Sequence, residues 1–523
     1  MRTLIAALLA ALVAGCGTGS PAGDTPAPAA LDVAELSLAD AAARMADGAL
    51  TSRALTEAYL QRIADLDDAG PGLNAVIDTN PNALDEADAR DRERQAGQAR
   101  GPLHGIPVLL KDNIDIAGMV NSAGSLALAE HRPARDAFLV ERLRAAGAVI
   151  LGKTNLSEWA NFRSTRSTSG WSSRGGQTKN PYALDRNPCG SSSGTGSAIA
   201  ASFAAAGVGT ETDGSIICPS SVTGLVGVKP TVGLVSRSGI IPISISQDTA
   251  GPMARTVTDA AHLLSGMAGV DPADPAGSAA DGRIAADYAA GLSADALAGT
   301  RVGLLRNAMG YHPDVDAAAE RAAEAIRQAG GTVVDVRIDD YGAWDPPELE
   351  VLLYEFKDGL NRYLAQSGAP VRALADLIAW NRDNAAQAMP IFGQELFERA
   401  EAKGPLTDAA YVKARDSARQ LALGALMNAL SASSLDALLA PSMSPAWPTD
   451  HVLGDHFVGA GYGMAAVAGT PSITLPAGET HGLPLGVTLM GPAYSEQALL
   501  GYAYALEQRL KARIAPDFSA TIE

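Results

Sequence analysis

The feature that most constrains the fold is an alternation of apolar runs with a helical segment between residues 106 and 152. Residues 106–110 form a continuous apolar run, residues 138–147 place apolar side chains at helical spacing, and residues 148–152 are again apolar. Apolar runs of this length predict strands that are buried on both faces. The order strand, helix, strand predicts a wound α/β sheet, so we expect an α/β fold.

The rest of the chain extends this pattern. Strands are predicted at residues 301–305, 437–441, 472–476 and 485–489, and helical spacing dominates residues 37–100, 197–206, 347–428 and 496–510. Residues 157–197 are rich in Ser, Gly, Asn and Pro and predict loops. With no internal break as marked as the one near residue 30, residues 31–523 are expected to form one domain, with residues 340–440 as its specificity region.

The first thirty residues have a composition of their own. Arg2 precedes an apolar run at residues 4–13, which is too short to cross a bilayer core of ~30 Å at ~1.5 Å per residue and indicates a signal peptide. The run ends in LVAGC, which resembles the bacterial lipobox, whose cysteine (here Cys16) is lipidated. Residues 1–15 are therefore predicted to be a lipoprotein-type signal peptide and residues 16–30 a flexible tether. We expect an exported protein of the bacterial cell envelope, held to the membrane only by this anchor.

Charge and cysteine usage exclude several classes of function. The chain has 58 acidic and 40 basic residues and no long basic run, which argues against nucleic acid as a partner. Its seven histidines have no ligand-like spacing, and Cys189 and Cys218 lie in no Cys-x-x-Cys motif, so we expect no metal and no cofactor. An envelope compartment would permit these two cysteines to pair, but the sequence leaves the pairing open, as it does the oligomeric state.

A Ser/Gly-rich segment at residues 187–196 is the strongest candidate for chemistry. Within it, residues 190–194 match G-x-S-x-G, the nucleophile elbow of α/β-hydrolases, with Ser192 at the centre. That motif requires a strand leading directly into it, whereas the preceding residues are loop formers. No lysine follows a serine at the S-x-x-K spacing, and no P-loop lysine is present. The elbow therefore stays a weak alternative, which would make Ser192 the nucleophile.

In order and spacing, several segments together resemble the amidase signature family. They are NPCGSSSGTG at 187–196, GTETDGSI at 209–216, GLVGVKPT at 224–231, HGIP at 104–107, LKDNI at 110–114, AGTP at 468–471 and GLPLGV at 482–487. The resemblance spans nearly all of residues 31–510. It implies the amidase signature fold, a large mixed β-sheet core surrounded by α-helices. It also implies cofactor-free hydrolysis of carboxamide C–N bonds.

The resemblance assigns a Ser-Ser-Lys triad with Ser215 as nucleophile, Ser191 as bridge and Lys111 as base. A serine hydroxyl needs a base to become nucleophilic, and a lysine can serve only if its surroundings lower its pKa towards neutrality. In this family a cis peptide precedes the bridging serine, here the bond from Gly190. The implied oxyanion hole consists of the backbone N–H groups of Thr212, Asp213, Gly214 and Ser215.

The turn before Ser215 departs from the family's commonest pattern, T-D-x-G-G-S-I-R. It carries Glu211 for Asp, Asp213 for Gly and Ile217 for Arg. The carboxylate of Asp213 could accept hydrogen bonds from a substrate NH₂ group or could cap the turn, and the sequence leaves both open. Ser192 and Asp213 are therefore candidates for substrate binding or for support of the triad.

Within the family, the resemblance is strongest to bacterial peptide amidases, through the same segments and residues 169–177 and 246–253. It implies removal of the C-terminal amide of peptides, with release of ammonia through an acyl-enzyme. The alternatives are a broader amidase or aryl acylamidase and, in another class, a binding lipoprotein that has kept the fold without catalysis. The cytoplasmic tRNA-dependent amidotransferase subunit of the same family would carry no lipobox.

Overall fold

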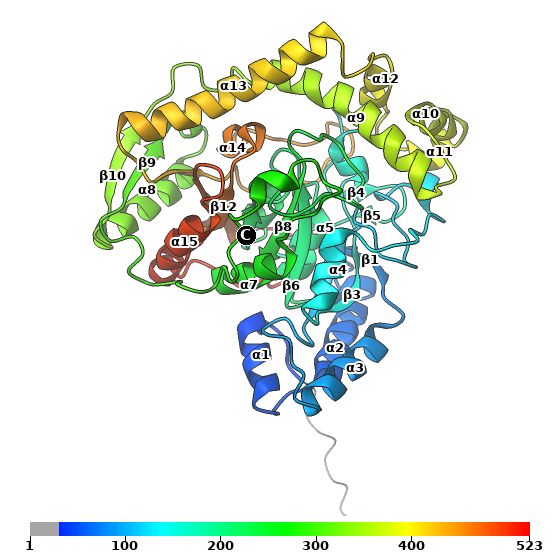
Figure 1. The fold of residues 1–523 in the computed structure, drawn as a ribbon, viewed down its shortest axis with the longest axis horizontal. Coiled ribbons are helices and arrows are strands. Elements are labelled where there is room, and N and C mark those ends of the chain that lie inside the picture. Colours follow the sequence, from blue (N-terminus) through cyan, green and yellow to red (C-terminus); the bar gives the residue numbers. More distant parts are fainter. Residues whose placement is uncertain (1–30, 523) are drawn as a thin grey trace, which may run out of the picture. The chain divides into compact units, whose positions relative to one another are not determined.

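A mixed sheet of eleven strands runs through the centre of the protein (Figure 1). The computed structural model describes residues 31–522. The strand order is β1-β3-β2-β6-β8-β7-β12-β13-β11-β9-β10, and a separate two-stranded sheet joins β4 and β5. The strands are β1 (Val76–Thr79), β2 (Pro107–Lys111), β3 (Val149–Thr154), β4 (Trp171–Ser172), β5 (Gly176–Gln177), β6 (Ala206–Glu211), β7 (Val226–Lys229), β8 (Thr249–Ala254), β9 (Arg301–Leu305), β10 (Thr332–Val336), β11 (Ala437–Pro441), β12 (Ser472–Thr480) and β13 (Leu483–Met490).

Three neighbouring strands of the sheet determine where polar groups gather. Strand β2 pairs in parallel with β3 on one side and with β6 on the other. Parallel strands end at the same edge of a sheet, so the last residues of β2 and β6, Lys111 and Glu211, lie on one rim. Because β2 and β6 are buried along their whole length, polar side chains at their ends face a water-poor environment.

Helices cover the sheet and extend beyond it. They are α1 (Leu38–Ala46), α2 (Ser52–Ile63), α3 (Ala83–Gln95), α4 (Phe138–Ala145), α5 (Ser193–Ala200), α6 (Ile217–Val222), α7 (Val257–Met267), α8 (Pro313–Gln328), α9 (Asp345–Ser367), α10 (Leu374–Asp383), α11 (Ala385–Ala388), α12 (Glu395–Glu401), α13 (Ala409–Ala432), α14 (Gly463–Ala468) and α15 (Glu496–Leu510), with short turns of other helix types between them. Helices α4, α7, α15 and α8 contact one another in succession, while α5 and α6 contact each other and pack on the central strands, α5 on β2, β6 and β8 and α6 on β7, β12 and β13. No helix within residues 31–522 combines the length and apolarity needed to cross a membrane.

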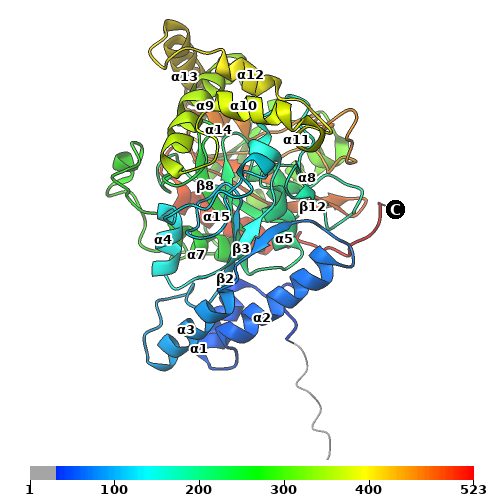
Figure 2. The same cartoon turned by 90° about the vertical axis from the view of Figure 1, so that its right-hand side faces the viewer.

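The predicted specificity region forms a helical layer of its own. Helices α9 to α13 lie at the end of the 32–522 body that is opposite to α1, α2 and α3 (Figure 2). A hydrophobic cluster joins α9, α10 and α12 to the loop around Trp159 and Phe162. The rings of Phe162 and Phe356 lie 5.0 Å apart, and those of Trp159 and Phe397 lie 5.8 Å apart. This packing fixes a loop that borders the candidate site.

Most predicted elements are present, often with the predicted bounds, as for β9, β11 and α15. The helix predicted at residues 197–206 is wrong in position, because α5 begins at Ser193 and ends at Ala200. The alanine-rich composition favoured a longer helix, but Ser202 adopts a φ of 59° and the chain then enters strand β6. The first turn of α5 packs against the backbone of Ala75 and Asn155, which is possible because residue 194 is glycine. An added Cβ there would collide with both carbonyl oxygens. Strand β1, inside the region expected to be largely helical, had no clear signal.

Candidate active site

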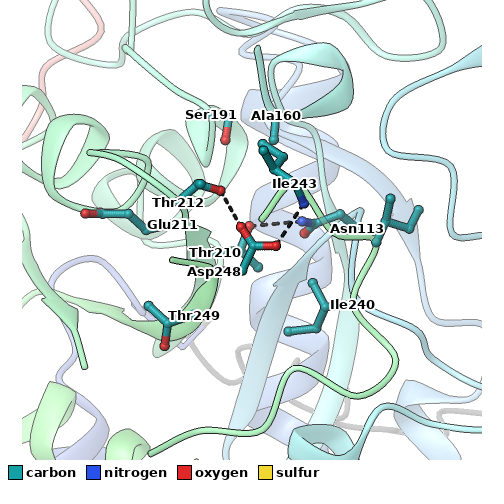
Figure 3. A pocket seen from close by; sticks show the side chains of 11 residues that line it. Asn113, Ala160, Ser191, Thr210, Glu211, Thr212, Ile240, Ile243, Asp248 and Thr249 are labelled. Atoms are coloured by element: carbon teal, nitrogen blue, oxygen red, sulfur yellow. Dashed lines mark hydrogen bonds between the residues drawn. The ribbon is translucent and has the colours of Figure 1, made fainter. Parts of the chain in front are cut away.

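Lys111 is fully buried at the end of β2 and makes three hydrogen bonds. Its Nζ donates to Ser191 Oγ at 2.7 Å, to Thr210 Oγ1 at 2.9 Å and to the Thr210 carbonyl at 3.1 Å. Asn113 Nδ2 donates to the same Thr210 hydroxyl at 3.0 Å (Figure 3). Strands β2 and β6 and the loop before α5 therefore converge on one amine, and Lys111 and Ser191 lie together as the family resemblance implied.

The surroundings of Lys111 favour its neutral form. Burial lowers the pKa of Lys111 to about 7, although the charges of Glu211 and Asp248 oppose the shift. No ion pair to Lys111 is formed within residues 31–522, and its partners are hydroxyl and carbonyl oxygens. The amine can therefore accept a proton near neutral pH, which an exposed lysine cannot do.

The two serine loops are joined through their backbones. The peptide bond between Gly190 and Ser191 is cis, as expected. The backbone N–H of Ser192 donates to the Ser215 carbonyl at 3.2 Å. Glycine is required at position 190, because an added Cβ would collide with Ser157 Oγ. The segment that carries Ser191 is thus held directly against the segment that carries Ser215.

Ser192 has a different environment from Ser191. It is fully buried, and its Oγ donates to the Thr210 carbonyl at 3.1 Å and accepts from the Thr210 N–H at 3.2 Å. The chain before it is loop rather than strand, so the geometry of a nucleophile elbow is missing. The structure places Ser192 as a support for β6.

A turn between β6 and α6 presents free backbone donors beside Ser215. Within residues 31–522, no protein group accepts from the N–H of Thr212, Asp213 or Ser215. Glu211 closes the turn, with Oε2 accepting from Ile216 N at 2.7 Å and from Ile217 N at 3.0 Å. Such donors can bind the negative oxygen of a tetrahedral intermediate.

Two further contacts fix this turn from distant parts of the chain. Thr212 Oγ1 donates to Asp248 Oδ1 at 2.6 Å, and Asp248 in turn accepts from two backbone N–H groups of the 243–244 segment (Figure 3). Gly214 has a φ of 76°, and a side chain there would collide with the ring of Tyr462. The donors are therefore held in place before any ligand arrives.

Ser215 and Asp213 open into a cavity of about 220 Å³. Its wall also includes Leu352 from α9 and Trp447 from the segment after β11. A second cavity, of about 10 Å³, lies against Ser191 and shares Thr212 with the first. Of the predicted specificity region, residues 340–440, Leu352 is the part that reaches the larger cavity.

Asp213 gives this cavity a negative character. Its side chain is exposed to the cavity, while Glu348 nearby is buried and accepts from Gln247 Nε2 at 2.7 Å. Although part of its surface opens into the cavity, desolvation by the surrounding protein, together with the charges of Glu348 and Glu211, raises the pKa of Asp213 well above its ordinary value. Burial and the charge of Asp345 likewise raise the pKa of Glu348 to about 7. Within residues 31–522, Asp213 neither caps the turn by a hydrogen bond nor has a cationic partner.

A disulfide joins Cys189 to Cys218, with their Cα atoms 6.0 Å apart. The bond links the loop before Ser191 to helix α6, which follows Ser215. The pairing that the sequence left open is therefore formed, and it ties both serine loops together. Cys16 lies outside the described residues. In residues 31–522 no group of three or more His, Cys, Asp or Glu side chains is arranged to hold a metal ion.

Sequence reasoning missed several residues that shape this site. Asn113 and Asp248 lie inside segments that carry the family resemblance, so a signal for them existed. Tyr462, Asp455 and Glu348 lie in segments with no motif, and their positions near Ser215 depend on the path of the chain. Thr210 was part of a recognised segment, but its two bonds to Lys111 were not predictable from it.

Comparison with known proteins agrees with this geometry. The family model for amidases matches residues 54–500. A probable amidase of Arabidopsis thaliana is 41% identical over 483 residues, which are 90% of this chain and 89% of that protein. A glutamyl-tRNA(Gln) amidotransferase subunit of Pseudomonas syringae pv. syringae is 35% identical over 491 residues, 91% of this chain and 97% of that protein.

The fold, the site and these matches define the class: the chain belongs to the amidase signature family and is an amidase, a hydrolase of amide bonds. Among solved structures it is similar to native peptide amidase from Stenotrophomonas maltophilia. The two are 56% identical with a TM-score of 0.90, over 92% of this chain and 99% of that one.

Proposed function

We propose that this amidase removes the C-terminal amide of peptides and releases ammonia. The observation that carries the proposal is the buried Lys111 amine, 2.7 Å from Ser191 Oγ, beside a cavity that contains Ser215. The 56% identity to a peptide amidase supports peptides as the substrate class.

The proposed reaction uses the three side chains in sequence. Ser215 Oγ attacks the amide carbon while its proton passes to Ser191 Oγ and the Ser191 proton passes to neutral Lys111. The carbonyl oxygen becomes negative and is bound by the free N–H groups of Thr212, Asp213 and Ser215. The C–N bond then breaks, the proton returns through Ser191 to the nitrogen, and ammonia leaves. Water hydrolyses the resulting ester by the same proton path.

The charges in the cavity support a neutral C-terminal group over an acidic one. Among residues 31–522, Asp213 and Asp455 line the cavity, and no lysine, arginine or histidine does. Burial, and to a lesser extent the neighbouring carboxylates, raise the pKa values of Asp213 and Glu348, so both groups become charged only as the pH rises. A peptide amide is uncharged at this position, whereas the product carboxylate would meet no cation there and would be repelled by Asp213 and Asp455 when these are ionised. The lining therefore favours substrate binding and product release.

The test is a substrate panel with ammonia or amine release measured for each member. The panel contains peptide amides, single amino-acid amides, free glutamine, anilides and fatty amides. We expect the highest kcat/KM for peptide amides. A preference for anilides would instead identify an aryl acylamidase, and comparable rates on all amides a broad amidase. Glutamine is included because of the amidotransferase relative, and a preference for it would contradict the proposal. Absence of any hydrolysis would favour the alternative that the protein binds its ligand without catalysis.

We also propose that the protein is exported and anchored to the cell envelope through Cys16, on the resemblance of residues 12–16 to a lipobox. Expression in a bacterium with radiolabelled palmitate tests this. The wild type should be labelled and should fractionate with membranes, and Cys16→Ala should do neither. Unlabelled wild-type protein would contradict the anchor.

A further inference from the structure

The most exposed large apolar side chains of residues 31–522 occur together on one loop. We call residues 449–462 the mouth loop. Val452 is 85% exposed, Leu453 73%, Val458 60% and Phe457 52%, whereas the other exposed large apolar side chains reach 41% at most. Single exposed apolar side chains are common on any protein, but four within seven positions form a patch that indicates an interaction site.

The mouth loop continues the wall of the active-site cavity. Asp455, Phe457 and Tyr462 line the cavity that contains Ser215. The apolar patch therefore begins inside the cavity at Phe457 and extends outward along the same loop. The loop thus offers apolar surface to the part of a ligand that extends beyond the cavity when its amide lies at Ser215.

Hydrogen bonds hold the mouth loop in its exposed conformation. Asp450 Oδ1 accepts from Val452 N at 2.8 Å and from Leu453 N at 2.9 Å, which forms a local turn. Asp455 accepts from Ser169 N at 3.0 Å and from the Trp447 indole N–H at 3.2 Å. The apolar side chains thus lie on a loop that is fixed on both sides of them, as a binding surface requires.

We propose that the mouth loop is the subsite for apolar side chains of the peptide that precede the residue bearing the amide. The inference deepens the proposed function and rests on it. Continuity with the cavity favours a substrate as the occupant. The loop contains two aspartates and no lysine or arginine, and its two histidines, His451 and His456, contact Gln177 and Asp450, so it lacks the lysine and arginine side chains by which protein surfaces bind anionic membranes.

The experiment compares two substrates in matched variants. One substrate is a tripeptide amide with Leu at its first two positions, and the other is an N-acetyl amino-acid amide with the same C-terminal residue, which is too short to extend from the cavity to Val452 and Leu453. In Val452→Ser/Leu453→Ser, we expect kcat/KM for the tripeptide amide to fall about fivefold, or about 1 kcal/mol. The acetylated amide should be hydrolysed at the wild-type rate. A tripeptide amide with Ser at both positions should be affected less than about twofold.

Leu421→Ser/Met427→Ser is the matched control, because both residues lie on α13 and are exposed to 39% and 41%. It should leave all substrates unaffected. Equal effects of the two double variants, or no substrate-dependent effect, would overturn the subsite. Binding to lipid vesicles is measured in parallel. Its loss in Val452→Ser/Leu453→Ser, with unchanged kinetics, would identify the mouth loop as a membrane-binding surface instead. Failure of the wild type to hydrolyse any peptide amide, while it hydrolyses other amides, would refute the proposed function itself.

Discussion

The wall that carries Lys111, Ser191 and Thr210 borders the smaller cavity, whereas the mouth loop borders the larger one, and the two are built in opposite ways. On the wall, Lys111, Ser191 and Thr210 are buried and joined by hydrogen bonds of 2.7 to 3.1 Å. On the mouth loop, Val452 and Leu453 are mostly exposed and their side chains have no comparable bonds. Proton transfer requires fixed distances and a shifted pKa, which burial provides. Recognition of varied side chains requires open apolar surface, which burial would remove.

The largest expected effect on activity comes from replacing Ser215, and it distinguishes Ser215 from Ser192. We predict that Ser215→Ala lowers kcat for a peptide amide by about 10⁴-fold or more, because no acyl-enzyme can form. Ser192→Ala should retain far more activity, since Ser192 only hydrogen-bonds to Thr210. Ammonia release and circular dichroism on both variants provide the measurement. The opposite order, with Ser192 essential and Ser215 dispensable, would revive the α/β-hydrolase alternative.

Lys111 should determine the pH dependence. Since its pKa is lowered to about 7, the amine is protonated below that pH and cannot accept a proton. We therefore expect kcat/KM to rise about tenfold per pH unit below about pH 7 and to level off above it.

Lys111→Met should lower the rate by about 10²- to 10⁴-fold and abolish this inflection. The comparison is made over a series of buffers with folding monitored at each pH. An unchanged inflection near pH 7 in the variant would show that another group titrates there.

Asp213 should affect the selection of ligands by their charge more than the rate of the chemical step. In Asp213→Asn we expect inhibition by a peptide acid, the reaction product, to strengthen about tenfold at a pH high enough to ionise Asp213 in the wild type, a change of about 1.4 kcal/mol. The peptide amide KM should change much less, because the amide is neutral. The two constants are measured by inhibition kinetics with ammonia release. Equal changes in both would show that Asp213 does not select by charge.

The disulfide should have the smallest effect on rate. Cys189→Ser/Cys218→Ser removes a link across a sequence separation of 29 residues, which on chain entropy stabilises the fold by about 3 to 4 kcal/mol. We expect a lower midpoint of thermal unfolding, with kcat/KM at 25 °C reduced less than about tenfold, because hydrogen bonds still hold the wall. Calorimetry and peptide-amide kinetics check this. A loss as large as that of Lys111→Met would mean that the disulfide itself positions the triad.

The amino-acid sequence was enough to predict the fold class and most strands, because their apolar patterns are local properties. The grouping of Lys111 with Ser191 was implied by the family resemblance, since Ser191 lies on the loop before α5 and no local pattern brings that loop to the end of β2. The sequence did not decide whether Asp213 binds a substrate NH₂ group or caps the turn. Its position facing a cavity near Glu348 and Asp455 became visible in the folded chain, because those residues come from segments more than a hundred positions away.

Long-range packing also sets the position of α5 and the place of the mouth loop. Helix α5 can start at Ser193 because Gly194 allows close contact with the backbone of Ala75 and Asn155, more than thirty positions away, a constraint that helix propensity does not contain. Val452 and Leu453 are unremarkable apolar residues in the sequence. Their exposure on a loop that borders the cavity of Ser215, more than two hundred positions earlier, depends on how the chain returns to the sheet, which local pattern cannot specify.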